Sequence, residues 1–428
     1  WGERHYAGLI GSMTRHSGIM AIAALALIGV AVWGLSRLPT AFLPVEDQGY
    51  VLISAQLPDG ASKERTDVVM EEVGKIAEAT PGVDQVLTIS GLSVLDNSAS
   101  LQNAGVAYVV LKDWDERGKQ KGQDLLSIYQ HLNEALQHVL SAKTLVIVPP
   151  PIQGVGNASG FTMQVELKNG VSDYALLQSL TDTIVKNGEA QSSLQRLSTS
   201  FRSNVPQLEI VVDRIKAETL GVTVGQVFSA LSGYVGSSYV TQFNKFGRTF
   251  QVYAQASPEF RVSPDDIRNL EVKAGDGTMV PLGTVVDIKP MEGPSLISLY
   301  NLYPSATIVG GPATGFSSGQ ALDVMEQIAG QTLPTGTGYE WTALSYQEKA
   351  VGGQIYYIFA LGMLLVYFVL AGQYESWILP LAVLLAVPLA LLGTVGALMA
   401  AGVANNLYTQ IGLILLIALA SKNAILIV

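Results

Sequence analysis

Hydrophobic residues gather in four long runs, one near the beginning of the chain and three at its end. The runs are Ser17–Ser36, Val351–Gly372, Ile378–Ala401 and Leu407–Val428. About 20 consecutive apolar residues are enough to cross the hydrocarbon core of a bilayer. The four runs contain no Asp or Glu, and Lys422 is their only charged residue. The pattern therefore predicts four transmembrane helices.

The residues between the first and second runs alternate between strand and helix patterns. Tyr50–Leu57 changes from apolar to polar with a period of two, as strands do, and Ser62–Ala79 has the helical period with Ser62 as an N-cap. From residue 50 to residue 151 the segments follow the order β-α-β-β-α-β. That order is typical of the ferredoxin-like split βαβ motif.

A second copy of this pattern is interrupted. It begins at Phe161–Lys168 and resumes at Ser305–Gly311, after a different module at about Val205–Ser295 with a hairpin-like stretch that turns near Asn244–Gly247. The predicted divisions are 1–40 for the lead-in and first transmembrane helix, 41–160 for the first repeat, 161–204 and 296–347 for the two parts of the second repeat, 205–295 for the inserted module, and 348–428 for three transmembrane helices. The fold class is a helical membrane domain joined to α+β domains.

Composition supports a membrane protein and excludes several other classes. Hydrophobic residues make up 49% of the chain and charged residues 14%, against a usual charged share of about 25%. The formal net charge of −10 argues against a nucleic-acid partner. Cysteine is absent and the four histidines form no tight metal-binding spacing, so we expect neither a metal nor a cofactor. No nucleophile and base stand in an enzyme-like pattern.

The ends of the chain suggest a segment of a longer protein. The sequence opens at Trp1, its first residues do not form a signal peptide, and it stops at Val428 inside an apolar run. Arg15 and His16 precede the first run and favour a cytoplasmic start. The α/β part would then lie on the other side of the membrane, which is the periplasm in a bacterium.

Lys422 is the residue with the clearest functional signal. A lysine at mid-membrane depth costs roughly 3 kcal/mol on insertion scales. The lysine could snorkel to the interface, but the apolar run continues after Asn423, which favours a buried role. A buried Lys422 needs a carboxylate partner, and the membrane runs of this chain supply none. Clusters of lysine and carboxylate within membranes are typical of proton relays.

The segment Ile89–Gly105 joins two predicted strands and is rich in small and polar residues. It carries Leu92, Leu95 and Leu101 at intervals. A flexible connector explains this composition, and so does a loop that moves past a bound substrate. The sequence leaves both interpretations open.

Several stretches together resemble one family. They are "RLPTAFLPVEDQG", "LKDW", "LPTGTGYEW", "LSYQE", "QYESW" and "ASKNAILIV", in that order. This order is similar to that of the resistance-nodulation-division (RND) exporters, in the drug-exporting hydrophobe/amphiphile branch of Gram-negative inner membranes. The resemblance covers essentially the whole chain. It implies the C-terminal half of a pump that is built from two six-span repeats.

The resemblance also implies a mechanism and partners. The family is a homotrimeric proton-driven antiporter that moves amphiphilic small molecules, such as drugs, biocides and detergents, from the periplasm and inner membrane to an outer-membrane channel through a periplasmic membrane-fusion adaptor. The α/β repeats would be porter subdomains, and residues 205–295 a funnel-like docking domain. Lys422 would be the relay lysine with Asn423 beside it, and their acidic partners would belong to the other half.

The resemblance assigns two further sets of residues. The substrate-contacting set is Leu92, Leu95, Asn97, Ser100, Tyr108, Phe161, Met163 and Val165. The docking hairpin set is Tyr239, Phe243, Phe246 and Phe250. The switch loop of the best-known members is rich in phenylalanine, and here it is not; Val45 stands where some members have an acid at the cleft entrance. These departures predict a different or narrower range of substrates.

Two other functions remain open at this point. The heavy-metal branch of the superfamily needs several methionines that line the cleft, and Met163 is one candidate. A membrane scaffold or protein-export accessory without a substrate of its own is the second alternative. Two adjacent acids in the fourth span of the other half would decide for proton coupling.

Overall fold

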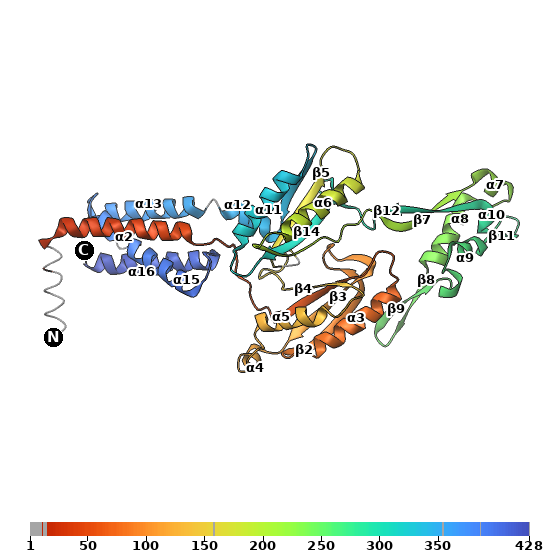
Figure 1. The fold of residues 1–428 in the computed structure, drawn as a ribbon, viewed down its shortest axis with the longest axis horizontal. Coiled ribbons are helices and arrows are strands. Elements are labelled where there is room, and N and C mark those ends of the chain that lie inside the picture. The colour runs from red at the N-terminus through yellow and green to blue at the C-terminus, as the bar shows by residue number, and fades with distance from the viewer. Residues whose placement is uncertain (1–10, 12–14, 157–158, 353–354, 386, 428) are drawn as a thin grey trace. The chain divides into compact units, whose positions relative to one another are not determined.

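The computed structural model of the chain (Figure 1) describes residues 11, 15–156, 159–352, 355–385 and 387–427. Most of the predicted lead-in before the first apolar run lies outside these residues. The chain divides into two compact units. Residues up to Arg202 and from Leu296 onward form the first unit, and Ser203–Ser295 forms the second.

The apolar runs form helices in the first unit. They are α2 (Ser17–Arg37), α13 (Ile355–Tyr374), α14 (Leu379–Leu384), α15 (Val387–Ala401) and α16 (Leu407–Ile427). Within the described residues, three stretches are long and apolar enough to span a bilayer, namely Gly18–Arg37, Leu379–Ala401 and Leu407–Leu426. The predicted run Val351–Gly372 includes residues that are not described, and its described apolar part, Ala360–Tyr374, is shorter.

A small residue brings two of these helices together. Helix α2 packs on α15, and a Cβ on Gly34 would stand 2.6 Å from Val395 Cγ1. Small residues allow such close approach between membrane helices. Gly34 is therefore part of the contact that holds the first predicted span against the third.

The first α/β subdomain has one antiparallel sheet covered by helices on one face. Its elements are β1 (Tyr50–Gln56), α3 (Lys63–Glu78), β2 (Val83–Ser93), β3 (Ala99–Leu111), α4 (Trp114–Arg117), α5 (Leu125–Leu136) and β4 (Lys143–Ile147). The sheet order is β2-β3-β1-β4. Ile53 of β1 and Val73 of α3 belong to one buried core. The Ser62 and Asp124 side chains accept backbone N–H bonds and start α3 and α5.

The predicted connector in this subdomain is mostly β-hairpin, which corrects the expectation of a long loop. Strand β2 continues to Ser93 and β3 already begins at Ala99, with Leu92 paired to Ser100. Only residues 94–98 form the turn. Asn97 and Ser98 adopt positive φ values of 51° and 63° there, a conformation that Asn tolerates better than most residues.

The second α/β subdomain is assembled from two separate parts of the chain. Its elements are β5 (Phe161–Leu167), α6 (Tyr174–Glu189), β6 (Leu194–Ser198), β13 (Ser298–Tyr300), β14 (Tyr303–Pro312), α11 (Ser318–Thr332) and β15 (Thr337–Thr342). The sheet order is β13-β14-β5-β15, and β6 pairs with β14. Helix α12 (Ala343–Gly352) follows β15 and precedes α13.

The second unit is an insertion closed by its own first and last strands. Its elements are β7 (Val205–Val212), α7 (Arg214–Thr219), α8 (Val224–Leu231), η1 (Ser232–Gly236), β8 (Ser238–Lys245), β9 (Arg248–Ala254), η2 (Pro258–Phe260), α9 (Pro264–Asn269), β10 (Glu271–Lys273), β11 (Met279–Pro281), α10 (Leu282–Val285) and β12 (Val286–Gly293). Strand β7 pairs with β12 from Val205–Gly293 to Val212–Val286. Phe246 and Gly247, both at positive φ, form the turn between β8 and β9, as two-residue hairpins require.

Candidate functional site

A cavity of about 610 Å³ lies between the two α/β subdomains. The first subdomain contributes Tyr129 from α5 and Ile147 from β4, and the second contributes Arg196 from β6 and Val309 from β14. Most of the wall is apolar, and the charged residues that line it are Asp47, Asp124 and Arg196. Concave, mainly apolar sites with a few polar groups are typical of small-molecule binding.

Two glycines of the cavity wall, Gly160 and Gly310, allow two backbone segments to approach each other closely. Gly160 precedes β5 at a φ of 122°, and a Cβ there would stand 2.3 Å from the carbonyl oxygen of Gly310. The pairing of β14 with β6 is also irregular between Val309 and Gly311. A side chain at Gly160 would force the two backbone segments apart, so glycine is needed at this position.

Arg196 is the unusual side chain of the cavity. Its backbone is left-handed, with a φ of 56°, and its Cζ lies 4.0 Å from the centre of the Tyr129 ring. This distance corresponds to a cation–π contact. Among the described residues, the buried Nη1 atom has no hydrogen-bond partner. Burial lowers the pKa of the Arg196 guanidinium from its usual value, but an arginine remains charged at neutral pH.

The two acidic residues of the cavity wall already have partners. Asp47 accepts a hydrogen bond of 2.8 Å from Nη1 of Arg117, whose side chain is only 3% exposed. Burial raises the pKa of Asp47, but the hydrogen bonds from Arg117 and the Gly49 N–H outweigh it and hold that pKa below its usual value. Asp124 accepts bonds from the Ser127 backbone and hydroxyl. The charge of Asp47 is therefore offset by Arg117, whereas Asp124 is bonded to an uncharged serine, and among the described residues neither carboxylate forms an ion pair with Arg196.

Three predicted substrate residues come together on the face of the first sheet that the helices do not cover. Leu92, Leu95 and Tyr108 are half-buried and pack against Val106 and Ile147. Ile147 also lines the cavity. These three side chains thus belong to a cluster that includes one residue of the cavity wall, but they are not among the residues that line the cavity.

The turn that carries Asn97 is tied to the second subdomain by a residue that the sequence did not single out. Asp96 accepts hydrogen bonds of 2.6 Å from Ser93 and from Ser200, which follows β6. Ser100 lies opposite Leu92 in the hairpin. The contact between Asp96 and Ser200 joins distant parts of the chain, so no local pattern could reveal it.

Phe161, Met163 and Val165 occupy a different environment from the one expected. All three alternate along the face of β5 that meets α6 and α11, and all are buried, Met163 at 0% exposure. That these residues contact a substrate stays a prediction, and in this structure their side chains pack in the core of the second subdomain. The sequence alternation marked one face of β5 but not which face the helices cover.

Lys422 and Asn423 lie side by side in the chain on α16, and both are exposed on this helix. Among the described residues, no carboxylate lies within ion-pair distance of Lys422. Ser421, which precedes them, is buried. A partner for the lysine must therefore come from outside the described part of the chain.

The hairpin of the second unit presents aromatic side chains to the surface. Tyr239, Phe243, Phe246 and Phe250 are all exposed, Phe246 at 86%. Phe243 stacks on Phe250 with ring centres 5.5 Å apart. The core of this unit lies elsewhere, among residues such as Val227 and Leu282, and none of the four aromatic residues belongs to it.

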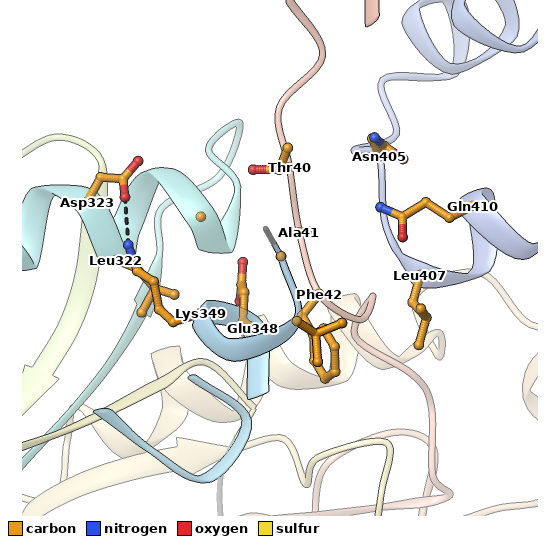
Figure 2. A pocket seen from close by; sticks show the side chains of 13 residues that line it. Thr40, Ala41, Phe42, Leu322, Asp323, Glu348, Lys349, Asn405, Leu407 and Gln410 are labelled. Carbon is orange, nitrogen blue, oxygen red and sulfur yellow. Dashed lines mark hydrogen bonds and ion pairs between the residues drawn. The ribbon is translucent and has the colours of Figure 1, made fainter. Parts of the chain in front are cut away.

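A smaller cavity of about 300 Å³ lies where the apolar helices meet the second subdomain (Figure 2). The segment after α2 pairs with the segment before α16, through bonds from Ala41 N to Asn405 O (3.1 Å) and from Asn405 N to Pro39 O (2.9 Å). The Gly319 N–H of α11 donates to Thr40 O at 3.2 Å. Thr40 therefore connects two apolar helices to a helix of the α/β part.

Charged side chains surround the same junction. Figure 2 shows the ion pair between Lys349 and Asp323, which is 2.9 Å long, and Lys349 also pairs with Glu326. The Ser318 hydroxyl donates to Glu348 at 2.8 Å. Burial raises the pKa of the Glu348 carboxyl and outweighs this hydrogen bond. Among the described residues no group of three or more metal-ligating side chains occurs.

Comparison with known proteins identifies the family of the chain. The family model described as the AcrB/AcrD/AcrF family matches residues 1–428. The toluene efflux pump membrane transporter TtgB of Pseudomonas putida is 36% identical over 99% of this chain. The multidrug export protein AcrF of Escherichia coli is 36% identical over 99% of the chain. The chain spans 40% of the length of TtgB and 41% of that of AcrF. It therefore belongs to the AcrB/AcrD/AcrF family, in the hydrophobe/amphiphile branch of the RND efflux pumps.

Proposed function

We propose that the chain is part of a proton-coupled exporter of amphiphilic small molecules in a bacterial inner membrane, with its α/β part in the periplasm. The observation that carries the proposal is the mainly apolar cavity between the two subdomains, in a chain whose described residues include three stretches long and apolar enough to span a bilayer. Relatives named as toluene and multidrug efflux pumps support it. An amphiphile would place its apolar part against this wall.

The architecture supports an assembly of several proteins. We assign the two sheets to ferredoxin-like porter subdomains and Ser203–Ser295 to a docking domain. The exposed aromatic hairpin of that domain would contact a neighbouring copy in a homotrimer, and the trimer would bind a periplasmic membrane-fusion adaptor and an outer-membrane channel. Exposed aromatic clusters are typical of contact surfaces.

Lys422 would couple export to the proton gradient, with Asn423 beside it. Its acidic partners would lie in a part of the protein beyond this chain, and one of them would take up a proton and release the lysine. This change of charge would shift the balance between two conformations of the apolar helices. The segment at Thr40 offers a route from these helices to the second subdomain, since it is bonded to both. The proton gradient would supply the energy for export, and we expect no cofactor.

The test uses the complete protein in vesicles with an imposed pH gradient. We expect uptake of an amphiphilic dye into the vesicle lumen while the gradient lasts, and loss of uptake when a protonophore removes it. Equal uptake with and without the gradient would overturn the proposal of proton coupling.

The alternatives are less well supported. The heavy-metal alternative depended on Met163, and that side chain is buried in the core. A scaffold without substrate would need neither a cavity of this size nor a lysine in an apolar helix. Neither alternative is favoured by a specific observation.

A further inference from the structure

The export of neutral amphiphiles does not by itself require Arg196. The guanidinium comes from β6 of the second subdomain and stacks on Tyr129 from α5 of the first. It lines the cavity with a buried Nη1 that has no hydrogen-bond partner among the described residues. The chain thus places a hydrogen-bond donor with a positive charge against an apolar wall.

Such an arrangement is unfavourable without a ligand. The Arg196 side chain is partly buried, and its buried Nη1 loses the hydration it would have in water, which contact with an aromatic face offsets only in part. The left-handed backbone at Arg196 adds strain, since residues other than glycine seldom adopt it. A negatively charged group on the ligand would compensate for the lost hydration of the guanidinium.

We propose that Arg196 determines specificity by binding the carboxylate of an acidic amphiphile whose apolar part lies against the cavity wall. Tyr129 positions the guanidinium by stacking on its face, so a carboxylate would approach the guanidinium along its edge. Planar guanidinium groups bind carboxylates through two parallel hydrogen bonds. This inference rests on the proposed function, because it specifies what the exporter cavity binds.

The other charges of the cavity favour an anion over a cation. Asp47 is paired with Arg117, and Asp124 is bonded to Ser127. A cationic ligand would be repelled by Arg196, and the charge of Asp47 is already offset by Arg117. A neutral ligand would offer the guanidinium only uncharged acceptors, and hydrogen bonds to uncharged acceptors are weaker than those to a carboxylate. An anionic head group is therefore the best complement to the described side chains.

The experiment compares two ligands that differ only in the head group. The complete protein is placed in lipid nanodiscs, without a proton gradient, and titrated with 11-(dansylamino)undecanoic acid or its methyl ester by fluorescence. We expect the wild type to bind the acid at least about tenfold more tightly than the ester, as hydrogen bonds to a charged group imply. Arg196→Gln should weaken acid binding by about ten- to a hundredfold and change ester binding by less than about twofold.

Three variants separate recognition from a structural role. Arg196→Lys should keep part of the preference for the acid that Arg196→Gln loses. Lysine retains the positive charge but lacks the paired N–H donors that bind a carboxylate through two hydrogen bonds. Tyr129→Phe should keep the preference, because the ring remains. Arg65→Gln, on the exposed side of α3, is the matched control and should bind both ligands as the wild type does.

Two outcomes would overturn the inference. One is a wild type without a preference for the acid, and the other is an equal loss of both ligands in Arg196→Gln. Export of the ester under a proton gradient tests the proposed function separately. Intact ester export with no acid preference refutes only the role of Arg196, and a clear acid preference with no export refutes only the exporter.

Discussion

The ion pair between Arg117 and Asp47 shows how one largely buried contact holds a residue of the cavity wall in place. Arg117 Nη1 lies 2.8 Å from Asp47, and Arg117 Nε donates to the Lys112 carbonyl at 2.7 Å. Asp47 also accepts a bond from the Gly49 N–H. The segment that leads from the first apolar helix into β1 is thereby attached to the end of α4. Removal of either charge leaves its partner partly buried and unpaired.

This pair predicts a dependence of stability on pH. The pKa of Asp47 is lowered in the folded state, so its contribution is present above the unfolded value of about 4 and is lost as pH falls through the lower folded pKa. Asp47→Asn should destabilise the protein by about 1–2 kcal/mol near pH 7, and the difference from the wild type should shrink below about pH 4. Thermal unfolding of the complete protein at several pH values measures it. A difference that stays constant from pH 7 to pH 3 would contradict the assignment.

At the scale of elements, periodicity predicted the strands and helices better than it predicted their contacts. The order of elements around β1 and α3 follows from alternation and from Ser62 as a cap. The length of the β2–β3 hairpin could not be predicted from the sequence, because small and polar residues are compatible with both strands and loops. The stacking of Arg196 on Tyr129 joins residues far apart in the sequence, and no local pattern encodes such a contact.

The floor of the cavity offers a test of one such contact. Gly160→Ala would place a Cβ 2.3 Å from the Gly310 oxygen, whereas Gly170 also has a positive φ but open space around it. Both alanine variants bear backbone strain, of roughly 1 kcal/mol or more, and only Gly160→Ala must also separate two strands. We expect Gly160→Ala to lower the unfolding temperature clearly more than Gly170→Ala does. Equal shifts would mean that the backbones are not in close contact.

The hairpin of the inserted unit gives a second prediction at this scale. Phe246 is the most exposed of its aromatic residues and stands at the turn. Replacement of Phe246 and Phe243 by serine should weaken trimer or channel assembly without unfolding the unit, whose core is elsewhere. Native mass spectrometry of the complete protein measures the trimer. Trimers of unchanged stability, with full coupling to the channel, would show that the hairpin is not a contact arm.

At the scale of the whole molecule, the chain combines apolar helices with α/β subdomains. Three of the apolar stretches among the described residues are long enough to span a bilayer, and the α/β subdomains have their own cores. The junction at Thr40 connects the two through backbone hydrogen bonds to Asn405 and Gly319. The sequence predicted the division into membrane and α/β parts because hydropathy is a local property. It could not predict the junction, which depends on how segments meet after folding.

Lys422 carries the central claim, because it is the only charged residue of the predicted spans. Under the proposed function, loss of its charge should stop proton-coupled movement while the α/β subdomains and the cavity between them remain intact. The most direct measurement is dye uptake by the complete protein in vesicles with an imposed pH gradient, for the wild type and for Lys422→Ala. The account predicts that Lys422→Ala still forms trimers and still binds the dye, but takes up no more dye than vesicles treated with a protonophore. Gradient-driven uptake by Lys422→Ala at the wild-type rate would contradict it.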